Sequence, residues 1–314
     1  MNDETYPLAG ERVNRVGYGA MQLPGPGVFG PPRDRQQAID VLRYVVEAGV
    51  NHLDTAYYYG LGVANELIRE ALHPYPDDLV LVSKVGARRD GSGGLHDAQR
   101  PEDLREGVLA NLTSLELDQV PVVNLRRHAE SDVPLEEQVA AMKALRDEGL
   151  IGAIGLSNVT PEQYRSAREV SEIACVQNGY NLADRSDQGV FDSCAADGVP
   201  YVPFFPLGSA FGIGKPVLTA PAVLTSAARL GVTPAQVALA WLLQRSPNVL
   251  LIPGTSSFAH ARENLAAAAV ELDDQALADI GLPGQPRRDR YPDAGLLQRL
   301  GEAGRHRPIG RRST

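Results

Sequence analysis

Short apolar runs alternate with amphipathic stretches along most of this chain. The runs at residues 50–54 and 79–84 have the length and apolar character of strands that are buried on both faces of a parallel sheet. Residues 35–48, by contrast, repeat apolar side chains at helical spacing. Asp34 precedes them as a candidate cap, and Gly49 follows them as a stop. The pattern therefore predicts strands and helices in alternation.

Eight strands are expected, at residues 16–21, 50–54, 79–84, 120–125, 151–156, 174–177, 200–204 and 249–252. The expected helices lie at residues 35–48, 63–72, 101–115, 134–148, 161–172, 188–197, 222–230, 234–244, 259–268 and 274–280. Eight such units without a linker predict a single α/β domain, a (β/α)8 TIM barrel over residues 1–282, with a short hairpin within residues 5–16. A doubly wound sheet is the weaker alternative, since no Gly-x-Gly-x-x-Gly motif follows an early strand.

The composition is that of a soluble globular protein, with 43% hydrophobic and 22% charged residues. No apolar run reaches about 18 residues, and residues 1–10 lack the apolar centre of a signal peptide. We therefore expect a cytoplasmic protein with no membrane partner. The two cysteines, Cys175 and Cys194, are expected to be free thiols. The sequence contains no cluster of Cys and His residues of the kind that binds zinc, so no metal site is expected.

Charge is distributed unevenly along the chain. A net charge of -9 argues against nucleic acid as the main partner. Residues 283–314, however, carry eight arginines against Asp289, Asp293 and Glu302, and they are rich in Gly and Pro. We expect this segment to be a basic, mobile extension of a monomer or weak homo-oligomer.

Three polar residues at the ends of neighbouring strands are candidates for acid–base chemistry. Asp54 ends the second expected strand, Tyr59 lies in the loop beyond it, and Lys84 ends the third strand. The phenol is the candidate acid, because an adjacent ammonium group lowers the pKa of a tyrosine by favouring the phenolate. Asp54 would hold the lysine in place. An ordinary buried ion pair beside a packed tyrosine is the alternative interpretation.

Further strand ends carry groups suited to a heterocyclic ligand. Ser157, Asn158, Gln177 and Asn181 supply hydrogen bonds for an amide, and Tyr180 offers an aromatic face for a flat ring such as nicotinamide. After the eighth strand, the backbone amides of Gly254, Thr255 and Ser256 lead into a helix N-terminus, which would suit phosphate. Ser257 as an ordinary N-cap is the competing explanation.

The motifs DTAYYYG, SK at the end of the third strand, GLSN, VQNGYN, PFFPLG and IPGTSS resemble those of the aldo-keto reductase superfamily, in order and in spacing, over residues 13–280. The resemblance implies that Asp54, Tyr59 and Lys84 are catalytic and that Tyr180 stacks on the nicotinamide of NADPH. The residues it implies at the cofactor are Gly19, Met21, Asp54, Ser157, Asn158, Gln177, Tyr180, Pro206, Leu207, Gly208, Gly254, Thr255, Ser256, His260, Glu263 and Asn264. Gln22, Tyr57, Tyr58 and Phe205 are expected to line the substrate pocket.

The segments GYGAMQL, VNLR and AWLLQRSPN resemble a bacterial branch that includes NADPH-dependent pyridoxal reductases. Arg126 stands where the superfamily usually has a catalytic histidine, and His128, two residues on, could not replace it without a register shift. A guanidinium could polarise a carbonyl oxygen and bind the 3-oxygen of pyridoxal. Gly254 and His260 stand where many relatives place cations for the 2'-phosphate, yet NADPH remains the expected cofactor.

The sequence thus predicts an NADPH-dependent reductase of an aldehyde or ketone, with pyridoxal reduced to pyridoxine. One alternative is a reductase of another carbonyl, since the loops at residues 25–32, 88–99 and 207–219 cannot be read for specificity. Another is a regulatory subunit that binds NADPH without catalysis, which the intact Asp54, Tyr59 and Lys84 argue against. A nucleic-acid role of the basic tail is a more distant alternative.

Overall fold

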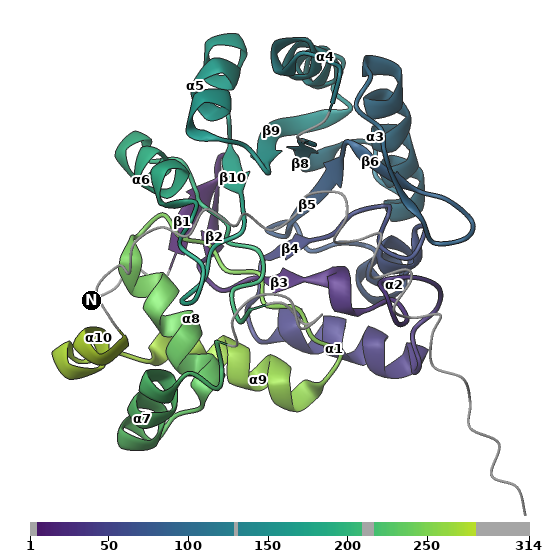
Figure 1. Ribbon diagram of the computed structural model, residues 1–314. Coiled ribbons are helices and arrows are strands. Elements are labelled where there is room, and N and C mark those ends of the chain that lie inside the picture. The colour runs from purple at the N-terminus through teal and green to yellow at the C-terminus, as the bar shows by residue number, and fades with distance from the viewer. Residues whose placement is uncertain (1–4, 129–130, 209–216, 281–314) are drawn as a thin grey trace, which may run out of the picture.

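A curled parallel sheet forms the centre of the computed structural model, which describes residues 5–128, 131–208 and 217–280 (Figure 1). Six strands pair side by side in the order β10 (Cys175–Gln177), β9 (Ile151–Ser157), β8 (Val120–Arg126), β5 (Val80–Val85), β4 (His52–Asp54) and β3 (Tyr18–Gly19). Two further segments complete the ring through parallel bridges. Tyr201 bridges Val176 and Val249, and Leu251 bridges Val16. The expected eight-stranded barrel is therefore confirmed.

Within the described ranges, ten α-helices surround the sheet: α1 (Arg35–Glu47), α2 (Val63–Leu72), α3 (Pro101–Leu115), α4 (Leu135–Asp147), α5 (Pro161–Val170), α6 (Gln188–Asp197), α7 (Pro221–Leu230), α8 (Pro234–Arg245), α9 (Phe258–Ala266) and α10 (Asp274–Ile280). Local signals fix their ends. The carboxylate of Asp34 accepts a hydrogen bond from the Gln37 amide at 2.9 Å, as expected for a cap. Thr160 and Thr233 cap α5 and α8, and a proline opens each of these two helices.

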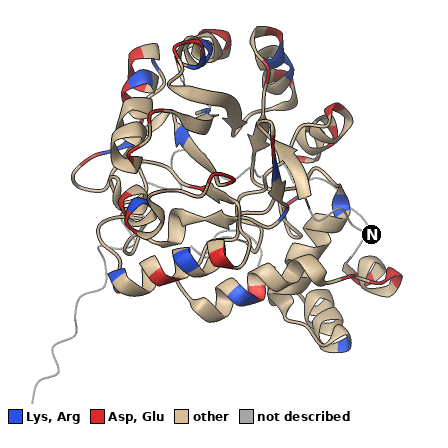
Figure 2. Ribbon diagram, turned by 180° about the vertical axis from the view of Figure 1, so that it is seen from behind, with Lys and Arg blue, Asp and Glu red and all other residues tan. Residues whose placement is uncertain are grey.

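The central strands β5 and β8 consist mainly of buried apolar residues. Residues of both charge signs lie on the outer helices (Figure 2). None of the helices within the described ranges is long and apolar enough to cross a membrane. Cys175 and Cys194 are free and buried, as expected.

The expected N-terminal hairpin consists of β1 (Thr5–Leu8) and β2 (Glu11–Asn14), paired antiparallel. Its buried Leu8 and Val13 belong to one apolar cluster with Val80 and Val122, which come from the barrel strands. The Asn14 amide also donates to the Asn51 side chain at 2.7 Å, just before β4. The hairpin therefore packs against the amino ends of the strands, opposite the polar residues that follow the carboxyl ends.

Two features differ from the expected elements. The first barrel strand is limited to β3 and the Val16 bridge, because residues 20–22 form a short 3-10 helix. In addition, the expected loop at residues 88–99 contains an antiparallel hairpin of β6 (Ala87–Arg89) and β7 (Leu95–Asp97). The expected tail at residues 283–314, the domain boundary beside it and residues 209–216 of the third specificity loop lie outside the described residues.

Candidate active site

Asp54 and Lys84 form a buried ion pair where β4 and β5 end. Each residue is 3% exposed, and the Lys84 ammonium also donates to the Thr55 carbonyl at 3.0 Å. The second carboxylate oxygen of Asp54 accepts a hydrogen bond from Gln177 Nε2 at 2.7 Å. A buried charge pair is stable only when its remaining hydrogen-bonding groups find partners, and here Thr55 and Gln177 supply them. The lysine is thus held rigidly, as the sequence led us to expect.

Tyr59 lies beside this pair, in the loop between β4 and α2. The Lys84 ammonium nitrogen is 5.0 Å from the centre of the Tyr59 ring. The ring is 8% exposed and meets the ring of Tyr58 edge to face at 5.2 Å. The structure therefore brings together the phenol, the ammonium group and the carboxylate that the sequence placed at neighbouring strand ends.

The pKa of Tyr59 moves in the direction opposite to our expectation. Burial raises this pKa well above the usual value of a phenol, and the nearby carboxylate of Asp54 raises it further. The charges of Arg126 and Arg89 oppose the rise. The phenol is consequently protonated at neutral pH, in the form that can donate a proton.

Arg126 ends β8 and is partly exposed. Its Nε atom is buried and has no hydrogen-bond partner among the described residues. The neighbouring His128 is buried, and its Nδ1 atom lies 2.6 Å from Asp97 of β7. The histidine is therefore paired with the β6–β7 hairpin.

The candidate amide-binding residues lie next to Arg126 along the rim of the barrel. The strand register places Arg126 opposite Ser157 and Ser157 opposite Gln177, so the three residues are consecutive neighbours across β8, β9 and β10. Asn158 follows with a positive φ of 61°, which is uncommon outside glycine and often marks functional positions. Asn181 instead donates to the Phe205 carbonyl at 3.1 Å, so it supports the next strand end.

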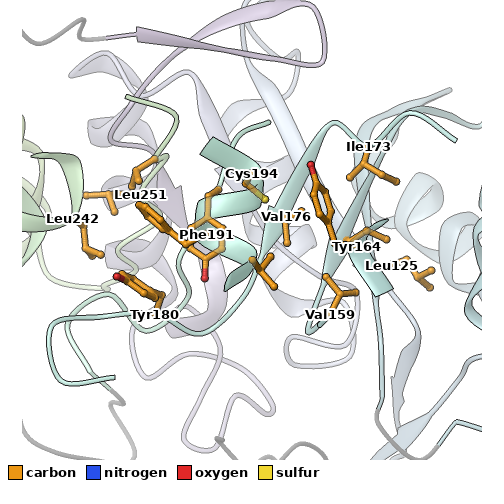
Figure 3. Close-up of a cluster of buried hydrophobic side chains, with 14 of the residues drawn as sticks. Leu125, Val159, Tyr164, Ile173, Val176, Tyr180, Phe191, Cys194, Leu242 and Leu251 are labelled. Atoms are coloured by element: carbon orange, nitrogen blue, oxygen red, sulfur yellow. The ribbon is translucent and has the colours of Figure 1, made fainter. Parts of the chain in front are cut away.

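Tyr180 does not lie at the rim. Its ring is fully buried, stacked at 5.1 Å on Phe191 of α6 and at 6.1 Å on Trp241 of α8. Figure 3 shows Tyr180 among buried hydrophobic side chains that include Phe191 and Leu242. Its hydroxyl also bonds to Gln188 at 2.6 Å. The expected stacking on a nicotinamide thus finds no exposed face on this ring, because residues from two distant helices cover it.

Phe204 is an aromatic residue at a strand end that the sequence analysis did not single out for the site. It is partly exposed, and its amide donates to the Asn178 carbonyl at 2.9 Å, where the seventh barrel segment pairs with the sixth. The signal was available in the PFFPLG motif, which puts two aromatic residues at a strand end. Phe205, Leu207 and Gly208 of that motif are partly exposed, and Pro206 is buried.

The segment after the eighth barrel segment presents free backbone donors. Among the described residues, the amides of Gly254, Thr255 and Ser256 make no hydrogen bond, while Ser257 caps α9, as the competing explanation held. Gly254 packs tightly against Gly19, since a Cβ atom at Gly254 would lie 2.3 Å from the Gly19 carbonyl oxygen. Such a turn at a helix N-terminus can bind an anion, and its glycines bring the backbone close to β3.

Three residues of α9 were expected at the same ligand. His260 is exposed on the first turn of the helix. Glu263 accepts a hydrogen bond from Thr233 of the α7–α8 loop, and Asn264 is buried. The helix therefore presents His260 to solvent and anchors Glu263 to its neighbour.

The expected substrate-pocket residues differ in exposure. Gln22, Tyr57 and Phe205 are partly exposed, as is Met21, which was expected at the cofactor, whereas Tyr58 is 2% exposed. One further polar residue near Tyr58, Arg89 of β6, was not anticipated, because nothing in the local sequence marks an arginine of an expected loop as buried.

A closed parallel barrel with this arrangement at the carboxyl ends of its strands defines a class of enzymes. The chain belongs to the aldo/keto reductase family, whose pattern matches residues 15–281, and it is therefore an oxidoreductase. It is 51% identical over 285 residues to the pyridoxine 4-dehydrogenase of Escherichia coli K12, covering 89% of this chain and 98% of that protein. It is 36% identical over 273 residues to an uncharacterised oxidoreductase of Schizosaccharomyces pombe, covering 87% of each.

A solved structure supports the same assignment. The structure resembles that of an aldo-keto reductase of Klebsiella pneumoniae in complex with NADPH, with a TM-score of 0.77, 28% identity and coverage of 92% of this chain and 99% of that one.

Proposed function

We propose that this protein is an NADPH-dependent carbonyl reductase and that pyridoxal, reduced to pyridoxine, is its preferred substrate. The observation that carries the proposal is the buried Tyr59, with Lys84 at 5.0 Å from its ring and with the charge of Arg126 nearby. The similarity to a pyridoxine 4-dehydrogenase supports the substrate, and the similarity to a reductase that binds NADPH supports the cofactor.

In the proposed reaction the bound cofactor supplies a hydride to the carbonyl carbon. Tyr59 donates its phenolic proton to the carbonyl oxygen and regains a proton from solvent after the alcohol forms. Lys84, fixed by Asp54, stabilises the transient phenolate of Tyr59. Arg126 stabilises the negative charge that develops on the carbonyl oxygen, as a positioned cation does without having to reorganise.

The residues at the rim fit a dinucleotide. Ser157, Asn158 and Gln177 would bind the carboxamide of the nicotinamide, and Phe204, in place of Tyr180, would provide the aromatic face. The unpaired amides at residues 254–256 would bind a phosphate group.

The adenosine end of NADPH would lie along the start of α9, beside His260. The exposed Arg262 on the same helix supplies a cation near the 2'-phosphate. Gly19 and Gly254 allow β3 and the phosphate-binding segment to pack closely together, because a Cβ atom on either residue would meet backbone.

The first test is the oxidation of NADPH and of NADH, followed by absorbance, with pyridoxal and with a panel of simple aldehydes and ketones. We expect selective turnover of pyridoxal with NADPH. Turnover of simple aldehydes alone would retain the mechanism and reject the substrate. Tight NADPH binding without turnover of any carbonyl would instead support the regulatory alternative.

The role of Tyr59 is tested by the Tyr59→Phe variant. General acid catalysis contributes about 10² to 10⁴-fold, so we expect kcat to fall by roughly that factor while the Kd for NADPH stays the same. Tyr6→Phe is the matched control, because its hydroxyl bonds to Gly198 at 3.1 Å, near the N-terminal hairpin. Wild-type turnover in the Tyr59→Phe variant would refute the assignment of the proton donor.

A further inference from the structure

Arg89 is a buried cation that joins the β6–β7 hairpin to the loop of Tyr58 and Tyr59. It is 6% exposed. Its Nε atom donates to the Tyr58 carbonyl at 3.0 Å, and Nη1 donates to the Gly93 carbonyl at 2.8 Å. The guanidinium also lies 6.0 Å from the centre of the Phe29 ring. These contacts fix the group in one orientation.

The Nη2 group of this guanidinium makes no hydrogen bond to the described residues. Nη2 is buried and has no hydrogen-bond partner within the described part of the chain, where Arg89 also forms no ion pair. The adjacent Asp90 does not supply one, because its carboxylate accepts bonds from Ser92 and Gly94 and contacts His96 at 2.6 Å. A buried charge without a partner costs several kcal/mol, so its position calls for a ligand.

Two further unpaired polar atoms lie around Tyr59. The Tyr58 hydroxyl and the Nε atom of Arg126 are buried without hydrogen-bond partners among the residues that the structure describes. The charges of Arg89 and Arg126 both act on the Tyr59 phenol, which lies next to the Tyr58 ring. Arg89 Nη2, the Tyr58 hydroxyl and Arg126 Nε are therefore unpaired donors near the proton donor, and a negatively charged acceptor would suit them. The cofactor phosphates would lie elsewhere, at residues 254–256.

We propose that Arg89 is a specificity-determining residue that binds an anionic oxygen carried by the carbonyl substrate. The inference rests on the proposed function and deepens it, since it defines the substrates as carbonyl compounds that bear a negative charge. Nη2 donates a charge-assisted hydrogen bond to the anion, while the Tyr58 and Gly93 carbonyls hold the guanidinium in place. Arg126 is then free to act on the carbonyl oxygen.

Two substrate groups could supply this anionic oxygen: a ring oxygen beside the aldehyde, or a phosphate ester further along the molecule. Pyridoxal offers the first, and pyridoxal 5'-phosphate offers both. The neutral comparison is 2-methoxybenzaldehyde, which has a similar shape around the aldehyde and no charge. The ratio of kcat/KM for each anionic substrate to that for the neutral one measures the selectivity for the anion.

Arg89→Gln removes the charge and retains a hydrogen-bond donor for the Tyr58 carbonyl. Arg88→Gln is the matched control, because Arg88 is its exposed neighbour on the same strand. We expect Arg89→Gln to lower kcat/KM for pyridoxal by about 10- to 100-fold, the range of a hydrogen bond to a charged group, with 2-methoxybenzaldehyde affected by less than a factor of three. A loss confined to pyridoxal 5'-phosphate would instead assign Arg89 to the phosphate.

Equal losses for the charged and the neutral aldehydes in Arg89→Gln would overturn the inference. If this variant does not fold, two measurements still decide it. Arg89→Lys is expected to keep the selectivity because it keeps the charge. In the wild-type enzyme, 3-hydroxypyridine in its anionic form should inhibit at least ten-fold more strongly than 3-methoxypyridine, and equal inhibition would contradict the proposal. Wild-type enzyme that reduces no carbonyl at all would refute the proposed function itself.

Discussion

At the scale of single residues, Arg126 sets the chemistry of the rim apart from that of a histidine site. A guanidinium stays charged over the physiological pH range, whereas an imidazole loses its charge near neutrality. We expect Arg126→Met to lower kcat/KM for pyridoxal by about 10²-fold, the loss typical of one donor to a developing oxyanion. Steady-state kinetics with pyridoxal and with simple aldehydes would measure it.

The control for Arg126 is Arg105→Met, which breaks an ion pair with Glu148 on the outer surface at 2.6 Å. Unchanged turnover of pyridoxal and of the simple aldehydes in Arg126→Met would contradict the polarising role.

His52 gives the protein a pH-dependent stability that is separate from catalysis. Its ring is 1% exposed on β4, and burial lowers its pKa from 6.5 to about 4, with partial opposition from the Asn14 backbone. Below pH 6.5 the imidazole of His52 is protonated in the unfolded chain but stays neutral in the folded one. The contribution of His52 to the free energy of unfolding is therefore complete above pH 6.5 and is lost as the pH falls toward 4. The difference between pH 7 and pH 5 is about 2 kcal/mol.

Urea unfolding at pH 7 and at pH 5 would measure this effect, with the His52→Gln variant as the comparison. Other groups titrate in the same range, so the quantity of interest is the difference between the two pH dependences. We expect the wild-type protein to lose about 2 kcal/mol more than the variant over this interval. An identical loss in both proteins would show that His52 is not buried in its neutral form.

At the scale of elements, most helices were predictable to within about two residues because their ends are encoded locally. Asp34, Thr160 and Thr233 cap helices at the start, and Gly198 and Gly231 end them in the left-handed conformation that glycine favours. The β6–β7 hairpin was not predictable in this way. Its strands have three residues each, and contacts distant in sequence, such as that of Arg89 with Tyr58, hold it.

The contrast between local signals and distant contacts also explains which parts of the candidate site were predictable. Asp54, Lys84, Ser157 and Gln177 were predictable because a parallel strand delivers whatever follows it to one rim. The environment of Tyr180 was not, since its burial depends on how α6 and α8 pack in three dimensions. The pKa of Tyr59 was misjudged for a related reason, because the extent of burial outweighs the nearby ammonium and no local pattern reveals it.

At the scale of the whole molecule, the barrel is closed where its first and last strands meet. The Leu251 amide donates to the Arg15 carbonyl, and the Gly17 amide donates to the Leu251 carbonyl, both at 2.8 Å. The Arg15 side chain, 6% exposed, adds bonds to the carbonyls of Val249 at 3.2 Å and Ser246 at 2.7 Å. One buried side chain thus ties the N-terminal segment to the end of α8 and to the strand that follows.

Arg15→Met should therefore weaken the closure of the whole ring. The substitution keeps an apolar stem but leaves two or more buried carbonyls without a donor, each at a cost of about 1–3 kcal/mol, so we expect the free energy of unfolding to fall by roughly 3 kcal/mol. Arg12→Met, on the exposed side of β2, is the control, and it should change stability by less than about 0.5 kcal/mol. Hydrogen exchange would locate the effect, because faster exchange should appear at Gly17 and Leu251 before it appears in β8 and β9. Uniformly faster exchange over all strands would show that Arg15 stabilises the fold as a whole and has no special role in closing the barrel.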